Sequence, residues 1–336
     1  MTRPSRLSSE VDFEREGKHT GFLRLPHSVH RSAYGWLPIP IASVKNGEGP
    51  RVLLMAGNHG DEYEGQVALM KLLRAIEPAD VRGRIVFLTA ANFPAAFAGM
   101  RTSPIDDGNL NRLFPGDPDG TVTQQIAYWI EHVMLPKCDY VIDLHSGGSS
   151  LMYVPSGLAR LSPDQERRRR TIELLRVFGA PCSYVGSATG TEDRTLTAAA
   201  ARQGVMHLSS ELGGGGQVTP AALRVAEEGL RRVLHHIGAL AGEAPPPADP
   251  PTRLLEVQAG AHYVYAPDAG LFEPLAELGQ EVAAGDPAGL IHFQDTPWRE
   301  PTLARFAASG LVLCKRVPGR TERGDCLFHL GADFTP

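Results

Sequence analysis

Residues 51–62 read RVLLMAGNHGDE, an uninterrupted apolar run that ends in a glycine and a polar turn. A strand that is covered on both faces needs such a run, whereas a strand with one face in water alternates apolar and polar side chains. The following residues, 64–76, repeat apolar side chains at close to helical spacing. We therefore predict a buried strand over 51–57 and a helix over 64–76, which together form the repeating unit of an α/β fold.

The same alternation of short apolar runs and longer helical stretches continues to about residue 240. Strand and helix in repetition predict an α/β fold whose sheet carries helices on both faces. The remaining predicted strands cover residues 84–90, 139–144 and 205–212, and the remaining predicted helices cover 123–135, 163–178 and 220–237.

The character of the sequence changes at residues 242–251, which read GEAPPPADPP. Proline at this density is incompatible with helix and strand, so this segment is predicted to be a stiff linker. We therefore predict two domains, an α/β catalytic domain over residues 1–243 and a small all-β domain over 252–336. The strand-like runs of the second domain cover residues 254–257, 262–266, 270–273, 290–293 and 311–314.

The composition excludes several classes of protein. Of 336 residues, 42% are hydrophobic and the net charge is −5, whereas disordered chains are less apolar and more highly charged. No run approaches the roughly 20 apolar residues of a membrane span, and residues 1–10 lack the apolar core of a secretory signal. The acidic balance indicates neither nucleic acid nor membrane as a partner. We expect a cytoplasmic protein whose four cysteines, which show no CxxC spacing, are reduced.

Two potential metal ligands follow the first strand. His59 and Glu62 stand three positions apart, at the junction between strand and helix. Sites in open α/β sheets form outside the carboxyl ends of the strands, and an imidazole and a carboxylate at this offset can reach one cation such as zinc. The alternative is an ordinary polar loop in which His59 hydrogen-bonds to the backbone.

A third potential ligand, His145, follows the predicted strand 139–144. If this strand neighbours 51–57, His145 completes a set of three ligands and leaves a fourth zinc position for water, as catalytic sites require. Asp143 could fix the tautomer of the imidazole. The alternatives are a hydrogen-bonded structural histidine and an aspartate that forms a turn.

Glu211 ends a third predicted strand and precedes four glycines, residues 213–216. A carboxylate at this position could serve as the base for a metal-bound water. The alternative is a glutamate exposed to solvent beside a flexible loop.

Arg101, Asn111 and Arg112 lie in a long loop rich in Gly and Pro, which is typical of functional loops. Arginine binds carboxylates through two hydrogen bonds and stabilises a developing oxyanion, and an asparagine amide can add a further contact. The alternative is that these arginines pair with Asp106 or Asp107.

Four of these stretches, in their order, resemble the succinylglutamate desuccinylase/aspartoacylase family, a branch of the zinc carboxypeptidase-like fold. They are GNHGDEYEG at 57–65, RTSPIDDGNLNRLFPG at 101–116, DLHSGG at 143–148 and SELGGGG at 210–216. Within the family the chain is most similar to the N-acetyl-diaminobutyrate deacetylases of bacterial ectoine degradation, also through GFLRLP at 21–26. The resemblance implies a mixed sheet flanked by helices, with a smaller C-terminal all-β domain.

The resemblance also implies one Zn²⁺ per chain, held by His59, Glu62 and His145. Residues 149–157, which follow the third ligand, are expected to line the acyl or side-chain pocket. The C-terminal β domain is expected to form either a wall of that pocket or an interface in a homo-oligomer.

The catalytic roles that the resemblance implies fall on four residues. Glu211 would be the general base and proton shuttle, and Arg101 would polarise the scissile carbonyl. Asn111 and Arg112 would bind the α-carboxylate of a small N-acyl amino acid substrate.

We therefore expect a zinc-dependent hydrolase that cleaves the amide bond of an N-acyl amino acid, as N-acetyl-2,4-diaminobutyrate deacetylases do. One alternative is a hydrolase of another substrate, such as N-acetylaspartate, N-succinylglutamate or a peptide. The other is a zinc-binding ligand sensor without turnover. The presence of a candidate base beside the ligands favours an enzyme, because a sensor needs no base.

Overall fold

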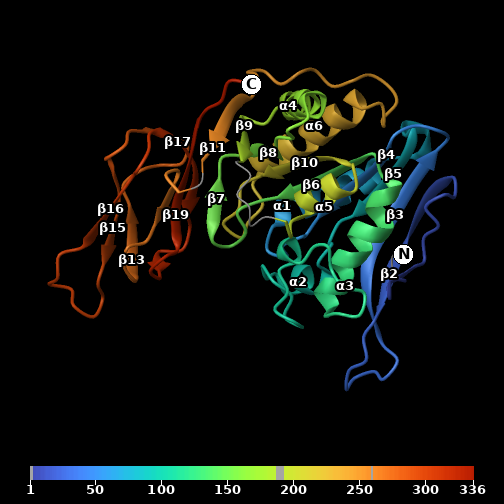
Figure 1. The fold of residues 1–336 in the computed structure, drawn as a ribbon, viewed down its shortest axis with the longest axis horizontal. Helices are drawn as coiled ribbons and strands as arrows, with labels where there is room; N and C mark the ends of the chain where they lie inside the picture. The colour runs from blue at the N-terminus through green and yellow to red at the C-terminus, as the bar shows by residue number, and fades with distance from the viewer. Residues whose placement is uncertain (1–2, 187–192, 259) are drawn as a thin grey trace.

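The computed structural model covers residues 1–336 and describes all of them except 1–2, 187–192 and 259. The chain forms an α/β body, and the C-terminal strands extend from one side of it as a β-rich lobe (Figure 1). The hairpin of β2 and β3 projects from the opposite end of the body. The three parts are connected by one continuous sheet.

This sheet has 15 strands. In the order of their hydrogen bonding, the strands along its main path are β1 (Ser8–Ser9), β2 (Gly17–Pro26), β3 (Trp36–Asn46), β5 (Gly83–Leu88), β4 (Arg51–Ala56), β6 (Tyr140–His145), β10 (Met206–Glu211), β8 (Ser156–Arg160), β9 (Cys182–Gly186), β11 (Arg253–Val257), β19 (Cys326–Asp333), β17 (Gly310–Arg316) and β14 (Glu281–Val282). Beside this path, β12 (Tyr263–Tyr265) pairs with β19 and β7 (Leu151–Tyr153) pairs with β17. A separate antiparallel sheet in the lobe consists of β16 (Thr302–Arg305), β15 (Pro287–His292), β13 (Gly270–Pro274) and β18 (Arg320–Thr321).

The strand β4 lies at the centre of the body, hydrogen-bonded in parallel to β5 on one side and β6 on the other. Its side chains alternate between the two faces of the sheet. Val52 and Leu54 belong to one apolar core, and Leu53 and Met55 belong to a second core on the opposite face. All four side chains are fully buried. Both faces are therefore covered, as the unbroken apolar run predicts.

Helices cover both faces of the sheet and contribute side chains to both apolar cores. α1 (Tyr63–Ala75), α4 (Gln165–Phe178) and α6 (Pro220–His236) pack on the face that contains Leu54. α3 (Val122–Trp129) and α5 (Leu196–Arg202) pack on the other face, and the short α2 (Phe93–Ala98) follows β5. The predicted fold class, a mixed sheet flanked by helices with a smaller C-terminal β part, is confirmed. Within the described ranges, no helix combines the length and the apolar character needed to cross a lipid bilayer.

The long N-terminal hairpin is not predicted from the sequence. β2 and β3 pair along their whole length, but β3 pairs with β5 only through residues 42–46. Pro38 and Pro40 lie outside this second ladder, where β2 is the strand that pairs with β3. Proline donates no hydrogen bond and is therefore tolerated at such an edge. In the sequence, the same prolines argue against a strand at this position.

The sheet continues beyond the Pro-rich residues 242–251, which form neither helix nor strand. β11 pairs in parallel with β9 and antiparallel with β19, and β7 of the body pairs with β17 of the lobe. The lobe has an apolar core of its own, which includes Phe272, Ile291 and Phe328. The division into domains at 1–243 and 252–336 stays a prediction, because hydrogen-bonded strands join the two parts.

Gly65 on α1 allows the helix to pack directly against β6, because an added Cβ atom would lie 2.6 Å from the Cβ atom of Leu144. We expect Gly65→Ala to lower the free energy of unfolding by about 1–3 kcal/mol, since overpacking outweighs the better helix propensity of alanine. Urea unfolding measures this difference. Gly319→Ala is the matched control, because a Cβ atom there meets nothing within 4 Å. Unchanged stability of Gly65→Ala would contradict the close packing.

Candidate active site

The carboxyl ends of three strands meet at one edge of the sheet. β4, β6 and β10 are parallel neighbours in this order. The ladders place Ala56 beside Leu144, and His145 beside Glu211. The condition stated for His145, that its strand neighbours the strand at 51–57, is therefore met.

The turn between β4 and α1 is held by close backbone packing. A Cβ atom on Gly60 would lie 2.0 Å from the carbonyl carbon of Ala95, and Gly57 has a φ of +69°. Glycine accepts both situations at low cost, whereas larger residues would displace the turn. Because Glu62 directly precedes α1, this turn delivers His59 and Glu62 to the same space.

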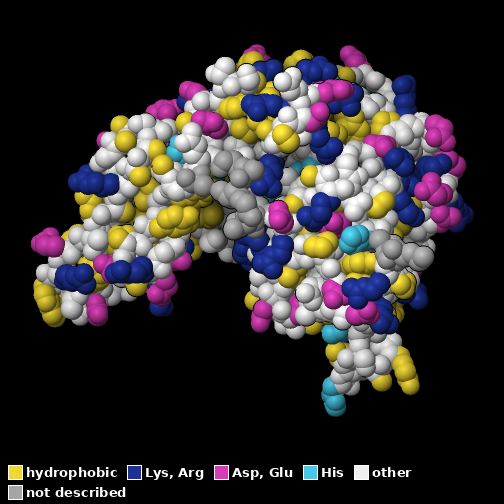
Figure 2. Space-filling model, in the orientation of Figure 1, with side chains coloured by type: hydrophobic (Ala, Val, Ile, Leu, Met, Phe, Trp, Pro, Cys, Tyr) yellow, Lys and Arg dark blue, Asp and Glu magenta, His cyan; other side chains and the backbone are white. Residues whose placement is uncertain are grey.

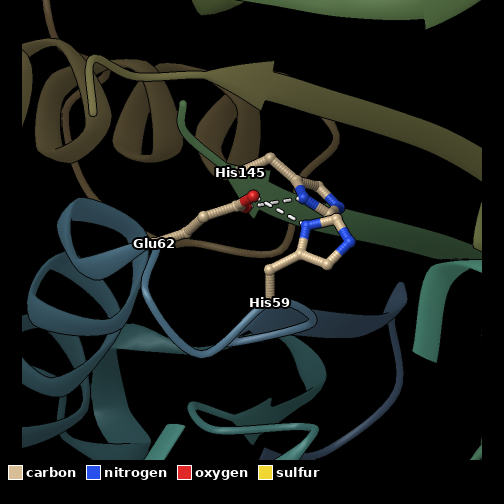
Figure 3. A group of neighbouring side chains, drawn as sticks. All are labelled: His59, Glu62 and His145. Carbon is tan, nitrogen blue, oxygen red and sulfur yellow. Dashed lines mark hydrogen bonds and ion pairs between the residues drawn. The ribbon is translucent and has the colours of Figure 1, made fainter. Parts of the chain in front are cut away.

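His59, Glu62 and His145 converge in this space (Figure 3). The Nδ1 atom of His59 lies 2.7 Å from Oε1 of Glu62, and Nδ1 of His145 lies 2.8 Å from Oε2 of the same carboxylate. The potential ligand atoms all lie within 4.8 Å of one another. The three residues are only 4%, 3% and 6% exposed, respectively. They form a group that could bind a metal ion.

The tautomers of both histidines suit a metal ion. Nε2 of His59 donates to Oδ1 of Asn109 at 3.1 Å, and Nε2 of His145 donates to Oδ2 of Asp143 at 2.7 Å. When these oxygens accept the Nε2 protons, a neutral ring directs the lone pair of its Nδ1 atom toward Glu62. A cation bound between the two Nδ1 atoms and the carboxylate would then be favourable. Nitrogen and carboxylate donors of this kind are the ligands of catalytic zinc sites.

The electrostatics of the group agree with a bound cation. Burial alone would raise the pKa of Glu62, but the charges of His59 and His145 hold this pKa well below its ordinary value. Burial alone would lower the pKa of His145, but Asp143 and Glu62 raise it well above its ordinary value. The carboxylates therefore favour positive charge at the point where the two Nδ1 atoms meet.

Glu211 faces this group from the end of β10. Burial raises the pKa of Glu211 well above its ordinary value, and the Glu62 carboxylate adds to this rise, whereas His145 and Arg101 oppose it. Its Oε2 atom has no hydrogen-bond partner among the described residues. A carboxyl group with a raised pKa is a candidate for proton transfer in catalysis. The exposed strand-end glutamate considered as the alternative is not what the structure contains.

A cavity of about 450 Å³ lies at this edge of the sheet. All seven predicted site residues line it: His59, Glu62, Arg101, Asn111, Arg112, His145 and Glu211. Figure 2 shows that Lys and Arg side chains gather along the side of the α/β body that faces the C-terminal lobe. The structure thus brings the predicted residues together, from segments between residues 59 and 211.

Arg101 reaches His59 and Glu62 from the loop after α2. Its Nη1 atom lies 3.4 Å from Oε1 of Glu62 and 3.4 Å from Nδ1 of His59. Asp106, the alternative partner, instead accepts hydrogen bonds from the backbone and hydroxyl groups of Thr123. Arg101 is therefore placed to share the charge of this group rather than to pair with that aspartate.

Asn111 and Arg112 form a short turn at the rim of the cavity. Oδ1 of Asn111 accepts a hydrogen bond from the backbone N–H of Leu196 at 2.9 Å, which ties the turn to the start of α5. Nη1 of Arg112 donates to the carbonyl oxygen of Asn111 at 2.7 Å. The side-chain oxygen of Asn111 is thus used by the fold, and its backbone carbonyl oxygen contacts Arg112.

Sequence reasoning missed several residues of the site. Asn109 orients His59, and Asn58 donates to Oδ2 of Asp143 at 3.1 Å. Asn58 directly precedes His59, and Asn109 stands two residues before Asn111, so proximity in the sequence was the available signal. Leu151 and Tyr153, from the segment 149–157 expected to line the pocket, do line the cavity. Other aromatic lining residues come from β9, β12 and β19, where no motif marks them.

Comparison with known proteins identifies the family. The family model described as succinylglutamate desuccinylase/aspartoacylase catalytic domain matches residues 48–237, which contain every predicted site residue. The chain belongs to the succinylglutamate desuccinylase/aspartoacylase family. The resemblance inferred from four motifs is thereby confirmed.

Members of this family resemble the chain over its whole length. It is 41% identical to an N-alpha-acetyl-L-2,4-diaminobutyric acid deacetylase of Halomonas elongata over 325 residues, which are 97% of this chain and 94% of the relative. The product-bound structure of the ectoine utilization protein EutE (DoeB) from Ruegeria pomeroyi has a TM-score of 0.93 at 39% identity, covering 98% of this chain and 99% of that one. A succinylglutamate desuccinylase/aspartoacylase from Rhodobacter sphaeroides has a TM-score of 0.93 at 39% identity, covering 99% and 100%.

Asp143 orients His145 through a hydrogen bond at the far side of the ring. We expect Asp143→Asn to weaken metal binding by about 10–100-fold, because a neutral amide is a poorer acceptor and supports the basicity of the imidazole less. Competition with a chromophoric chelator measures the affinity. Asp139→Asn, at the opposite end of the same strand and paired with Arg51, is the matched control. Equal affinities of the two variants would rule out this role of Asp143.

Proposed function

We propose that this protein is a zinc-dependent hydrolase that cleaves the amide bond of a small N-acyl amino acid, with Nα-acetyl-L-2,4-diaminobutyrate as the leading substrate. The observation that carries this proposal is the convergence of two imidazole Nδ1 atoms, a buried carboxylate and a second carboxyl group with a raised pKa in one cavity. The 41% identity to a deacetylase of that substrate, over nearly the whole of both chains, supports the choice of substrate.

In this proposal, His59, Glu62 and His145 would hold one Zn²⁺. A zinc ion in this position supplies Lewis acidity, which acidifies water and polarises a carbonyl group. Asn109 and Asp143 keep the Nε2 protons on the outer side of the rings, so that the Nδ1 lone pairs stay directed inward. The protein thus fixes the ligand geometry before the metal arrives.

Glu211 then acts as base and acid in turn. Its carboxylate accepts a proton from the attacking water, and the resulting carboxylic acid gives that proton to the leaving amine. A pKa that burial has raised above its ordinary value suits both steps, because a more basic carboxylate accepts the proton of water more readily. Arg101 adds positive charge next to the carbonyl oxygen as negative charge develops on it.

Arg112, held in place by Asn111, is proposed to bind the α-carboxylate of the substrate, with Asn111 adding an amide contact. Positive charge concentrated in one cavity lets a protein of net charge −5 attract an anionic group.

We also place the reaction in the cytoplasm. The free thiols of Cys138, Cys182, Cys314 and Cys326 support a reducing compartment.

Metal analysis combined with a substrate panel tests the proposed function. We expect about one zinc per chain and hydrolysis of Nα-acetyl-L-2,4-diaminobutyrate in preference to N-acetylaspartate and N-succinylglutamate. A chelator should abolish this activity, and added Zn²⁺ should restore it. Faster hydrolysis of another N-acyl amino acid would reassign the substrate. Bound zinc without hydrolysis of any member of the panel would favour a ligand sensor.

Glu211→Gln separates metal binding from proton transfer. We expect this variant to keep its zinc and to lose about 10²–10⁴-fold in kcat, because an amide cannot accept the proton of water. Steady-state kinetics and elemental analysis measure the two properties. Glu166→Gln on the exposed face of α4 is the control for the loss of a carboxylate. Near-normal kcat in Glu211→Gln would remove Glu211 from the mechanism.

A further inference from the structure

One wall of the cavity is aromatic and is built around His329. Tyr263 stacks on the imidazole of His329, with ring centroids 4.5 Å apart and an interplanar angle of 10°. Tyr184 and Tyr153 stand nearly perpendicular to the same imidazole, at centroid distances of 5.5 Å and 6.0 Å. These four residues, here called the aromatic wall, all line the cavity. They come from β7, β9, β12 and β19.

Packing alone does not explain why the polar residue His329 is buried at this position. The residue is 2% exposed, and neither ring nitrogen has a hydrogen-bond partner among the described residues. Burial lowers the pKa of His329 to about 3, with a further contribution from His262, so that the ring is neutral near pH 7. One ring nitrogen therefore carries a lone pair without a donor. A buried acceptor of this kind is unfavourable unless a ligand or water satisfies it.

A ligand that satisfies this wall carries a positive charge and N–H groups. The faces of aromatic rings attract cations such as ammonium groups. An ammonium group also donates the hydrogen bond that the lone pair of His329 lacks. The arginines proposed to act on the reacting carbonyl and the α-carboxylate, Arg101 and Arg112, come from a different part of the chain, between β5 and α3. The cavity thus combines residues suited to a carboxylate with residues suited to an ammonium group.

We propose that the aromatic wall binds a protonated amine on the side chain of the substrate, which makes N-acyl diamino acids the preferred substrate class. The proposal rests on the proposed function, because it assigns a part of the same cavity. It places substrate selection on the wall and bond cleavage on the residues at the sheet edge. Arg160 also lines the cavity and would instead favour a side chain with a carboxylate, so the test includes an anionic substrate.

Three substrates of similar shape distinguish these possibilities. Nα-acetyl-L-2,4-diaminobutyrate ends in an ammonium group, Nα-acetyl-L-norvaline replaces it with a methyl group, and N-acetyl-L-glutamate replaces it with a carboxylate. We expect the zinc-loaded protein to prefer the first substrate in kcat/KM. Preference for N-acetyl-L-glutamate would overturn the proposal and assign the side-chain subsite to Arg160.

Substitutions in the wall test its role directly. We expect Tyr263→Leu and His329→Phe to lower kcat/KM roughly tenfold for the diaminobutyrate substrate, mainly through KM, and to change the norvaline substrate less than about twofold. Tyr263→Phe keeps the ring face and is the conservative variant, expected to retain the preference for the diaminobutyrate substrate over the norvaline substrate. An equal loss on both substrates would show that the wall only maintains packing. Tyr263 is half-buried, so its variants test the wall even if His329→Phe fails to fold.

Binding measurements keep the two proposals separate. If the wild type hydrolyses none of the three substrates, the proposed function fails, and calorimetry with free L-2,4-diaminobutyrate and L-norvaline then tests the wall. Tighter binding of the diamino acid, lost in Tyr263→Leu and kept in Tyr263→Phe, would support the ammonium subsite. Equal binding of the two amino acids by the wild type would overturn it.

Discussion

The arrangement of this site depends on one buried carboxylate. Glu62 is almost completely enclosed and has a histidine Nδ1 atom within 2.8 Å of each of its oxygens. An ion at such a depth is stable only beside opposite charge, because desolvation of an isolated carboxylate is very unfavourable. A proton or a metal ion can supply this charge, but the outer hydrogen bonds to Asn109 and Asp143 direct both lone pairs inward. The rest of the molecule holds Glu62 and the two histidines close together, although this proximity is unfavourable without such a charge.

Backbone packing provides the rigidity that this proximity requires. Glu64, on the first turn of α1, accepts a hydrogen bond from the backbone N–H of Gly214 at 2.9 Å. The proposed base, Glu211, stands three residues before that glycine, and the ligand Glu62 stands two residues before Glu64. Gly147 continues the connection, because its N–H donates to the carbonyl oxygen of Gly213. The glycines after β10 thus allow the backbone to approach these neighbours closely. They connect the loop after Glu211 to the segment that carries the potential metal ligand Glu62.

The chemistry of the site could be predicted from the sequence to a much greater extent than its selectivity. The buried strands have unbroken apolar runs, and the polar residues that follow them, such as His59 and His145, share an edge once the strands are parallel neighbours. The N-terminal hairpin was missed because Pro38 and Pro40 are tolerated only where the strand has one partner. Asn109 was missed because no periodicity marks a residue that acts through a histidine. His329 was missed because strand pairing alone connects it to the cavity.

Selectivity by the aromatic wall follows from how the C-terminal strands are attached. β11 continues the ladder of β9, and β19 then pairs with β11, β12 and β17. Tyr184 on β9 and His329 on β19 are therefore positioned by backbone hydrogen bonds within one sheet, rather than by the docking of a separate module. β7, which carries Tyr153, pairs with β17 and closes the connection from the side of the α/β body. The wall belongs to the same sheet as β4, and Glu62 stands in the turn that follows β4. Strand geometry therefore fixes the distance from the bond to be cleaved to the side-chain subsite. A substrate is then selected by the length and charge of its side chain together.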